Sequence, residues 1–267
     1  MNAFTLASTP PRSRWLLGLV TAVFIFGLMW HGAIAQWPDY HDFADTRPWL
    51  GIPNAANVLS NLPFAVIGAW GLWRLTCRHA GQPAADSNVV WRIFCGALVC
   101  TAAGSALYHW APDNGTLVID RLPIAWACAL LLCAFLAERV HPGWNTPASL
   151  ASALGLATLS VVHWWWTERH GQGDLRAYLF VQFLPMLLIP AVLALRLPAW
   201  RRDAVPGTTW CLVLGLYAAA KGLEMADRWM LETTQVASGH MLKHVLAAAA
   251  AACLVIAVVR RGVRFGR

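Results

Sequence analysis

Long runs of apolar residues, separated by short polar gaps, extend along almost the whole 267-residue chain. A helix needs about 20 apolar residues to cross the hydrocarbon core of a membrane. The gaps are rich in Pro, Gly, Asp and Arg and are too short to hold a soluble domain. The pattern predicts eight membrane spans, at residues 15–35, 55–75, 89–110, 117–138, 147–166, 176–196, 208–226 and 239–259.

The composition agrees with a bundle of membrane helices. Hydrophobic residues make up 58% of the chain and charged residues 12%, whereas a soluble domain usually carries about 25% charged residues. The net charge of +7 is spread over short loops rather than gathered on one basic face, so we expect no nucleic-acid partner. The seven Cys form no Cys-x-x-Cys pair, which indicates small buried side chains rather than metal ligands. We expect no protein partner either.

Basic and acidic residues alternate from loop to loop. Cytoplasmic loops of membrane proteins carry an excess of Lys and Arg, so the basic loops predict a cytoplasmic C-terminus. The short loops and the Ala-, Arg- and Trp-rich style of the sequence indicate a bacterial inner membrane. The arginines that carry this prediction are Arg12, Arg14, Arg74, Arg78, Arg92, Arg139, Arg196, Arg201, Arg202, Arg260, Arg261, Arg264 and Arg267.

The first apolar run has two interpretations. It is long enough for a membrane helix, but Arg12 and Arg14, the apolar stretch and Ala33-Ile34-Ala35 also resemble a signal peptide with its cleavage site. In both cases the chain divides into an N-terminal extension, residues 1–38, and a seven-helix domain, residues 39–267.

Five of the polar residues inside the expected spans are candidates for one site, because polar groups are costly there and usually functional. His240 and His244 open the last span, and their spacing of four places both imidazoles on one helix face. Ser105 and His109 share a face at the end of the third span, and Asp120 opens the fourth. The third span runs outward while the fourth and last run inward. We therefore expect all five side chains together at the outer, periplasmic end.

This set of residue types is suited to metal-assisted hydrolysis. Three His around one ion form the open type of zinc site, which leaves a position for water. Asp120 can then act as general base, and Ser105 can bond the water or the oxyanion that forms. The predicted zinc ligands are His109, His240 and His244.

The order and spacing of these residues resemble the alkaline ceramidases. They also resemble the wider superfamily of seven-helix membrane hydrolases that includes the adiponectin and progestin receptors. The resemblance covers residues 39–259 and rests on Ser60-Asn61-x-x-Phe64, Ser105-x-x-x-His109, Asp120 and His240-x-x-x-His244. It implies an all-α bundle of seven transmembrane helices, with the N-terminal helix or signal peptide added. It also implies zinc on the three His, Asp120 as the base that activates water, and Ser105 as a partner of the zinc-bound water or oxyanion. The reaction that it implies is cleavage of ceramide to sphingosine and a fatty acid.

Calcium is a further expectation from the resemblance. Eukaryotic alkaline ceramidases bind calcium in an acidic segment before the first core helix, but Asn54 stands here where they have a glutamate. Oxygen ligands could come from Asp39, Asp42, Asp45, Asn54 and Asn57. The alternative is a solvated acidic loop.

Two other functions stay open at this point. The substrate could be another acyl-lipid amide or ester instead of a ceramide-like membrane lipid. The protein could also be receptor-like, with a structural zinc.

Overall fold

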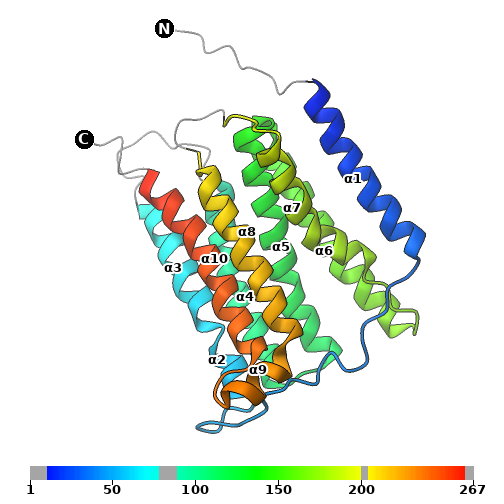
Figure 1. Cartoon of the computed structure of the whole chain (residues 1–267), viewed down its shortest axis with the longest axis vertical. Helices are drawn as coiled ribbons and strands as arrows, with labels where there is room; N and C mark the ends of the chain where they lie inside the picture. Colours follow the sequence, from blue (N-terminus) through cyan, green and yellow to red (C-terminus); the bar gives the residue numbers. More distant parts are fainter. Residues whose placement is uncertain (1–10, 78–88, 200–203, 262–267) are drawn as a thin grey trace.

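The computed structural model describes residues 11–77, 89–199 and 204–261. Over these residues the chain forms helices that stand side by side in one bundle (Figure 1). The long helices are α1 (Pro11–His31), α3 (Leu62–Cys77), α4 (Val89–Trp110), α5 (Asn114–Arg139), α6 (Pro147–Arg169), α7 (Arg176–Ala194), α8 (Gly207–Met225) and α10 (Gly239–Arg261). The short ones are α2 (Ala55–Leu59), η2 (Pro142–Asn145) and α9 (Asp227–Thr234).

Seven helical segments of the described chain are long and apolar enough to cross a membrane. They include α1, and α2 with α3 counts as one of them. The seventh expected span, residues 208–226, is also helical, as α8, but it carries Lys221 and Glu224 and is not among the seven segments. The prediction of an all-α, seven-helix membrane fold is confirmed.

The second expected span is broken near its start. α2 ends at Leu59 and α3 begins at Leu62. Pro63 is the second residue of α3, a position that tolerates the missing N–H of proline. The break leaves Ser60 and Asn61 between two helices, and both side chains are buried. The sequence pattern alone did not predict this interruption.

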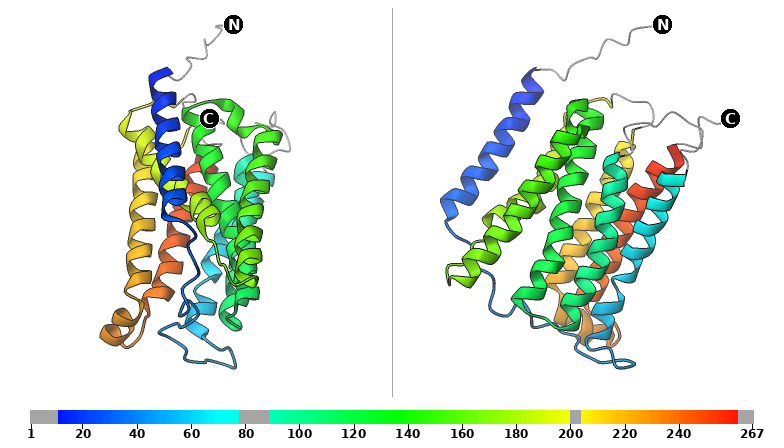
Figure 2. Two further views of the ribbon diagram at one scale, coloured as in Figure 1. Left: turned by 90° about the vertical axis from the view of Figure 1, so that its right-hand side faces the viewer. Right: turned by 180° about the vertical axis from the view of Figure 1, so that it is seen from behind.

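α1 stands at the edge of the bundle and packs mainly on α7 (Figure 2). Beyond His31 the chain leaves the helix and passes across the lower end of the bundle (Figure 1). On the way, the carbonyl of Ile34 accepts from the amide of Leu175 at 2.8 Å. The described part of the expected N-terminal extension, residues 11–38, therefore contacts the rest of the chain along α7 and through this segment.

α4 and α5 approach each other most closely beside two predicted site residues. A Cβ atom on Gly104 would lie 3.4 Å from the Cα of Asp120 and closer still to the carbonyl of Ile119, so only glycine fits. Pro123 has no N–H, and the carbonyl of Ile119 thereby lacks its ordinary partner one turn on. The close contact brings Ser105, which follows Gly104, against the start of α5.

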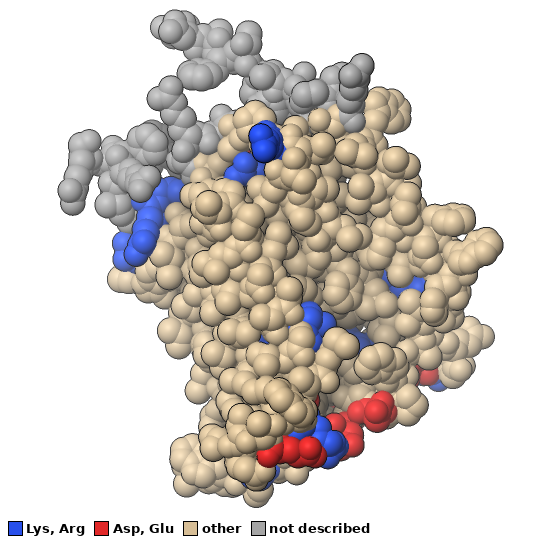
Figure 3. Space-filling view, viewed as in Figure 1, with Lys and Arg blue, Asp and Glu red and all other residues tan. Residues whose placement is uncertain are grey.

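A buried ion pair closes the end of the bundle where α5 and α10 finish. Glu138 bonds Arg261 at 2.7 Å and accepts from the amide of Val205 at 3.0 Å. Arg139 donates to the carbonyl of Val205 at 2.8 Å. Acidic side chains gather at the opposite end, around α9 (Figure 3). Of the arginines in the orientation prediction, Arg78, Arg201, Arg202, Arg264 and Arg267 lie outside the described residues, as does the side chain of Arg12.

Candidate metal centre

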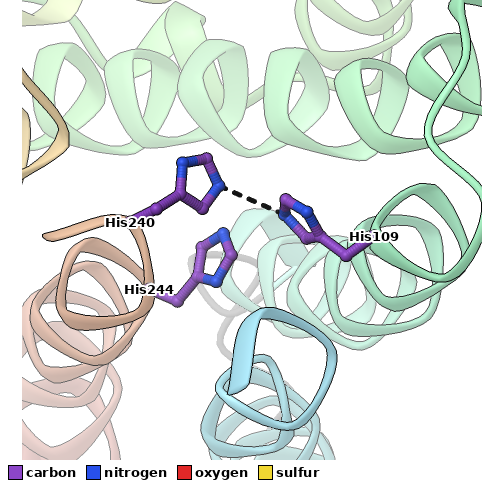
Figure 4. Close-up of side chains that lie close together, drawn as sticks. All are labelled: His109, His240 and His244. Atoms are coloured by element: carbon purple, nitrogen blue, oxygen red, sulfur yellow. Dashed lines mark hydrogen bonds between the residues drawn. The ribbon is translucent and has the colours of Figure 1, made fainter. Parts of the chain in front are cut away.

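Three histidines meet at the end of the bundle near α9. His109 lies in the last turn of α4, while His240 and His244 lie on one face of the first turns of α10. Their imidazoles point toward one another (Figure 4), and one nitrogen of each lies within 4.8 Å of the other two. All three side chains are buried. The prediction that these residues come together is confirmed.

The spacing of the nitrogens fits a metal ion such as zinc. Nitrogens bound to a tetrahedral zinc at about 2.0–2.1 Å lie roughly 3.4 Å apart. The Nε2 atoms of His109 and His240 are 3.3 Å apart. The ligand atoms of the other two pairs lie within 4.8 Å, so only small ring rotations are needed to bring all three nitrogens to one ion. Three neutral imidazoles are also a donor set that zinc prefers.

Ser60 fixes the orientation of His244. Its hydroxyl lies 3.0 Å from the carbonyl of Asn57, to which it donates, and 2.7 Å from Nδ1 of His244. Because a hydroxyl has a single proton, Nδ1 of His244 must be the donor in the second bond. The lone pair of His244 is thereby on Nε2, the nitrogen left to face the other two rings. The Ser60–Asn61 break in the second span places this hydroxyl beside α10.

Two further polar side chains hold the backbone of the histidines. The amide of Asn54 donates to the carbonyl of His109 at 2.8 Å. The carboxylate of Asp227 accepts from the amide of His240 at 2.7 Å and from that of Ala44 at 3.0 Å. Asp227 therefore ties the start of α10 to the segment before α2. It opens α9, a short helix that the hydropathy pattern did not predict.

Phe43 covers the imidazoles. Its ring centroid lies 4.6 Å from that of His109 and 4.8 Å from that of His240, and only 6% of the residue is exposed. An apolar ring at this position excludes water and lowers the local dielectric, which strengthens electrostatic interactions in the site. Sequence reasoning missed Phe43, because nothing in a loop sequence fixes where its side chain packs.

Asp120 and Ser105 are buried beside each other, as their predicted roles require. The side chain of Ser105 hydrogen-bonds that of Asp120 across the α4–α5 contact. Oδ1 of Asp120 is buried and has no hydrogen-bond partner within the described residues. The carboxylate therefore keeps a free acceptor in a site otherwise closed to water.

A lysine that sequence reasoning passed over connects Asp120 to the histidines. Nζ of Lys243 lies 3.1 Å from Nε2 of His240 and 2.9 Å from a carboxylate oxygen of Glu224. Lys243 also interacts electrostatically with Asp120. Glu224 pairs with Lys221 as well, one turn away on α8. The signal for Lys243 was its position between the two histidines of α10.

The three aspartates expected to bind calcium belong to no group of three or more His, Cys, Asp or Glu ligands in the described part of the chain. The three-histidine set is the metal-ligand group found among the described residues, and no aspartate of the segment before α2 belongs to one. Asp39 and Asp42 are exposed, and Asp42 lies 3.5 Å from Arg228. The amides of Asn54 and Asn57 donate to the backbone carbonyls of His109 and Asp45.

Asp45 is engaged by an arginine instead. Arg47 donates from Nε to one carboxylate oxygen at 2.8 Å and from Nη2 to the other at 2.7 Å. These hydrogen bonds hold the pKa of Asp45 below its ordinary value. Arg47 also donates to the carbonyls of Gln235 and Val236, between α9 and α10. Asp45 thereby fastens the segment before α2 to the chain just before the histidines of α10.

No family model matches the chain, and no curated protein matches its sequence. The class of protein is therefore defined by the fold and the site alone. The protein is an all-α membrane protein with a buried three-histidine group that can hold a metal ion such as zinc.

Proposed function

We propose that the protein is a zinc-dependent hydrolase of the alkaline ceramidase type. It cleaves the amide bond of ceramide-like lipids to a sphingoid base and a fatty acid. The observation that supports this most is Asp120, whose Oδ1 is buried without a hydrogen-bond partner in the described chain. Its carboxylate is hydrogen-bonded to Ser105, which lies one turn before His109 on α4. A structural metal site needs no such group, whereas a general base needs a free lone pair to take a proton.

The zinc ion, when bound, supplies a Lewis acid that acidifies water and polarises the amide carbonyl. Asp120 takes a proton from the attacking water at Oδ1 and passes it to the amide nitrogen as the C–N bond breaks. The oxygen of the water, with its remaining proton, becomes the hydroxyl of the fatty acid, and the nitrogen leaves as the free amine. Ser105 holds the carboxylate in place through its hydrogen bond. The ammonium of Lys243, anchored by Glu224, stabilises negative charge on the carbonyl oxygen.

The orientation of the protein forms part of the proposal. α5 and α10 end in arginines at the side remote from the histidines, and acidic residues surround the site end (Figure 3). The positive-inside rule then places the C-terminus in the cytoplasm and the site on the periplasmic side of a bacterial inner membrane.

The experiment is hydrolysis of a fluorescent ceramide by purified, zinc-loaded protein in detergent. Wild type releases the fatty acid, and Asp120→Asn lowers kcat about 100-fold or more, the usual contribution of a general base. The matched control is Asp113→Asn, because Asp113 caps α5 from outside the site and asparagine caps equally well. Zinc content is measured on the same samples, and His109→Ala loses the ion.

Two results would overturn the proposal in different places. If folded wild-type protein binds no transition metal, the metal centre itself is refuted. If zinc-loaded wild type cleaves no ceramide of any chain length, the substrate is refuted and the metal centre stands.

A further inference from the structure

Arg121, in the second turn of α5, is a buried cation enclosed by aromatic rings. Only 3% of the residue is exposed. The guanidinium carbon lies 4.1 Å from the ring centroid of Trp164, 5.0 Å from that of Tyr178 and 5.1 Å from that of Tyr40. Nη2 donates to Oε1 of Gln36 at 2.5 Å. These five residues are called the Arg121 cage below.

The charge of Arg121 is not balanced inside the cage. No acidic side chain of the described chain forms an ion pair with it. The neighbouring Asp120 interacts with it electrostatically but projects from a different side of the helix and forms no ion pair with it. Burying an unpaired cation is costly, and ionisable residues within membrane spans usually mark functional sites. The aromatic faces offset part of this cost, as cation–π contacts do, but they provide no counter-charge.

The cage also contains donors without acceptors. Nε and Nη1 of Arg121 and Nε1 of Trp164 are buried and have no hydrogen-bond partner among residues 11–77, 89–199 and 204–261. Arginine and the indole nitrogen can only donate, so the missing partner must be an acceptor. Buried donors left unsatisfied are rare and call for an explanation such as a bound ion or ligand. Positive charge and unfilled donors together specify an oxyanion.

The cage borders the metal centre. Asp120 precedes Arg121 on α5, and Tyr40, which stacks on Arg121, also interacts electrostatically with Lys243. Lys243 in turn lies against His240. A group held at Arg121 is therefore next to the residues proposed to act on the amide.

We propose that the Arg121 cage binds an anionic group, a carboxylate or phosphate, of an amphiphile. This inference adds a substrate preference to the proposed function, and it rests on that function for the claim that the substrate is an acyl amide. The lipid that the protein prefers carries an oxyanion close to its acyl amide, in contrast to an uncharged ceramide. Arg121 sets this specificity and takes no part in the bond cleavage.

The test compares two amides of equal chain length, N-lauroylglycine, which carries a carboxylate, and N-lauroylethanolamine, which is neutral. Binding is measured on zinc-loaded Asp120→Asn protein in nanodiscs of zwitterionic lipid, so that no hydrolysis intervenes. N-lauroylglycine binds about tenfold tighter or more, the scale of hydrogen bonds to a charged group. Adding Arg121→Gln abolishes the preference, and Arg121→Lys restores part of it.

Trp164→Phe separates recognition from packing, since it keeps the stacked ring and removes the Nε1 donor. It weakens binding of N-lauroylglycine several-fold without lowering the melting temperature. Trp165→Phe, on the same helix, leaves the affinity unchanged. A preference that survives Arg121→Gln, together with a lowered melting temperature, would assign Arg121 a purely structural role and overturn the inference.

Acetate and inorganic phosphate distinguish a lipid head from a free anion. Acetate and phosphate should displace N-lauroylglycine only at concentrations far above its own. Displacement at equal concentration would refute the proposal that the ligand is an amphiphile.

Hydrolysis of the two amides is followed separately on wild type. Arg121-dependent binding, together with hydrolysis of neither amide and of no ceramide, would refute the proposed function alone. Hydrolysis of both amides at equal rates, unchanged by Arg121→Gln, would refute this inference alone.

Discussion

Nδ1 of His244 donates a hydrogen bond to the hydroxyl of Ser60 at 2.7 Å. That bond selects the ring tautomer and leaves Nε2 for a metal. Groups that orient a ligand in this way typically contribute 10- to 100-fold to metal affinity. Ser60→Ala is therefore expected to weaken zinc binding by about that factor, measured by competition with a chromophoric chelator. Ser160→Ala is the control, because Ser160 is equally buried but bonds only its own helix at Ala157. Equal affinities for wild type and Ser60→Ala would contradict this role.

Gly104 allows α4 and α5 to touch beside Ser105 and Asp120. A methyl group there would meet the backbone of Ile119, and overpacking of this kind costs about 1–3 kcal/mol. Gly104→Ala is expected to lower the melting temperature in detergent and to reduce activity. Gly96→Ala, on the same helix but facing open space, should keep or raise the melting temperature, because alanine favours a helix. The same melting temperature for both variants would argue against the close contact.

The Asp45–Arg47 pair should make the segment before α2 sensitive to acid. The pKa of Asp45 is lowered in the folded state, so the pair stabilises the protein fully above the ordinary aspartate pKa of about 3.9. The stabilisation is lost as the pH falls through the lower, folded pKa. Arg47→Gln removes the pair and should move the acid unfolding midpoint to higher pH, measured by thermal melts between about pH 3 and 6. Chelator is present throughout, so that proton competition for zinc does not contribute. An unchanged midpoint would show that the pair contributes nothing.

Lys243 places a cation against the nitrogen of His240 that faces the other ligands. A like charge beside a divalent ion is unfavourable, by several kcal/mol at close range in a partly buried site. Lys243→Met is expected to bind zinc at least about threefold tighter while hydrolysing lipid more slowly. Lys221→Met provides the comparison, since Lys221 contacts Glu224 but not the histidine, and should change zinc affinity less. Weaker zinc binding in Lys243→Met would mean that the lysine supports the ligands.

The helices were predictable from the sequence because hydropathy and span length act locally. The α2–α3 break and α9 were not. The break depends on how Ser60 and Asn61 pack against other helices, and α9 is too short and too polar to register as a span.

The histidine group was predictable for a related reason. Helical spacing joins His240 to His244, and alternating helix direction brings His109 to the same end. Asp227 and Phe43 could not be foreseen, because their contacts depend on loop paths that no periodicity encodes. Lys243 was visible in the sequence, but only its contacts with His240 and Glu224 give it a place in the site.

His109 and His240 are 131 positions apart in the chain, and this separation has a consequence in time. A ribosome adds about 5–20 residues per second, so α10 is made roughly ten seconds after α4. Until then His109 is a lone imidazole, and no ion can be held by three ligands. Binding of the ion by all three ligands therefore requires that the last helix has been inserted, so an occupied centre indicates a fully assembled bundle.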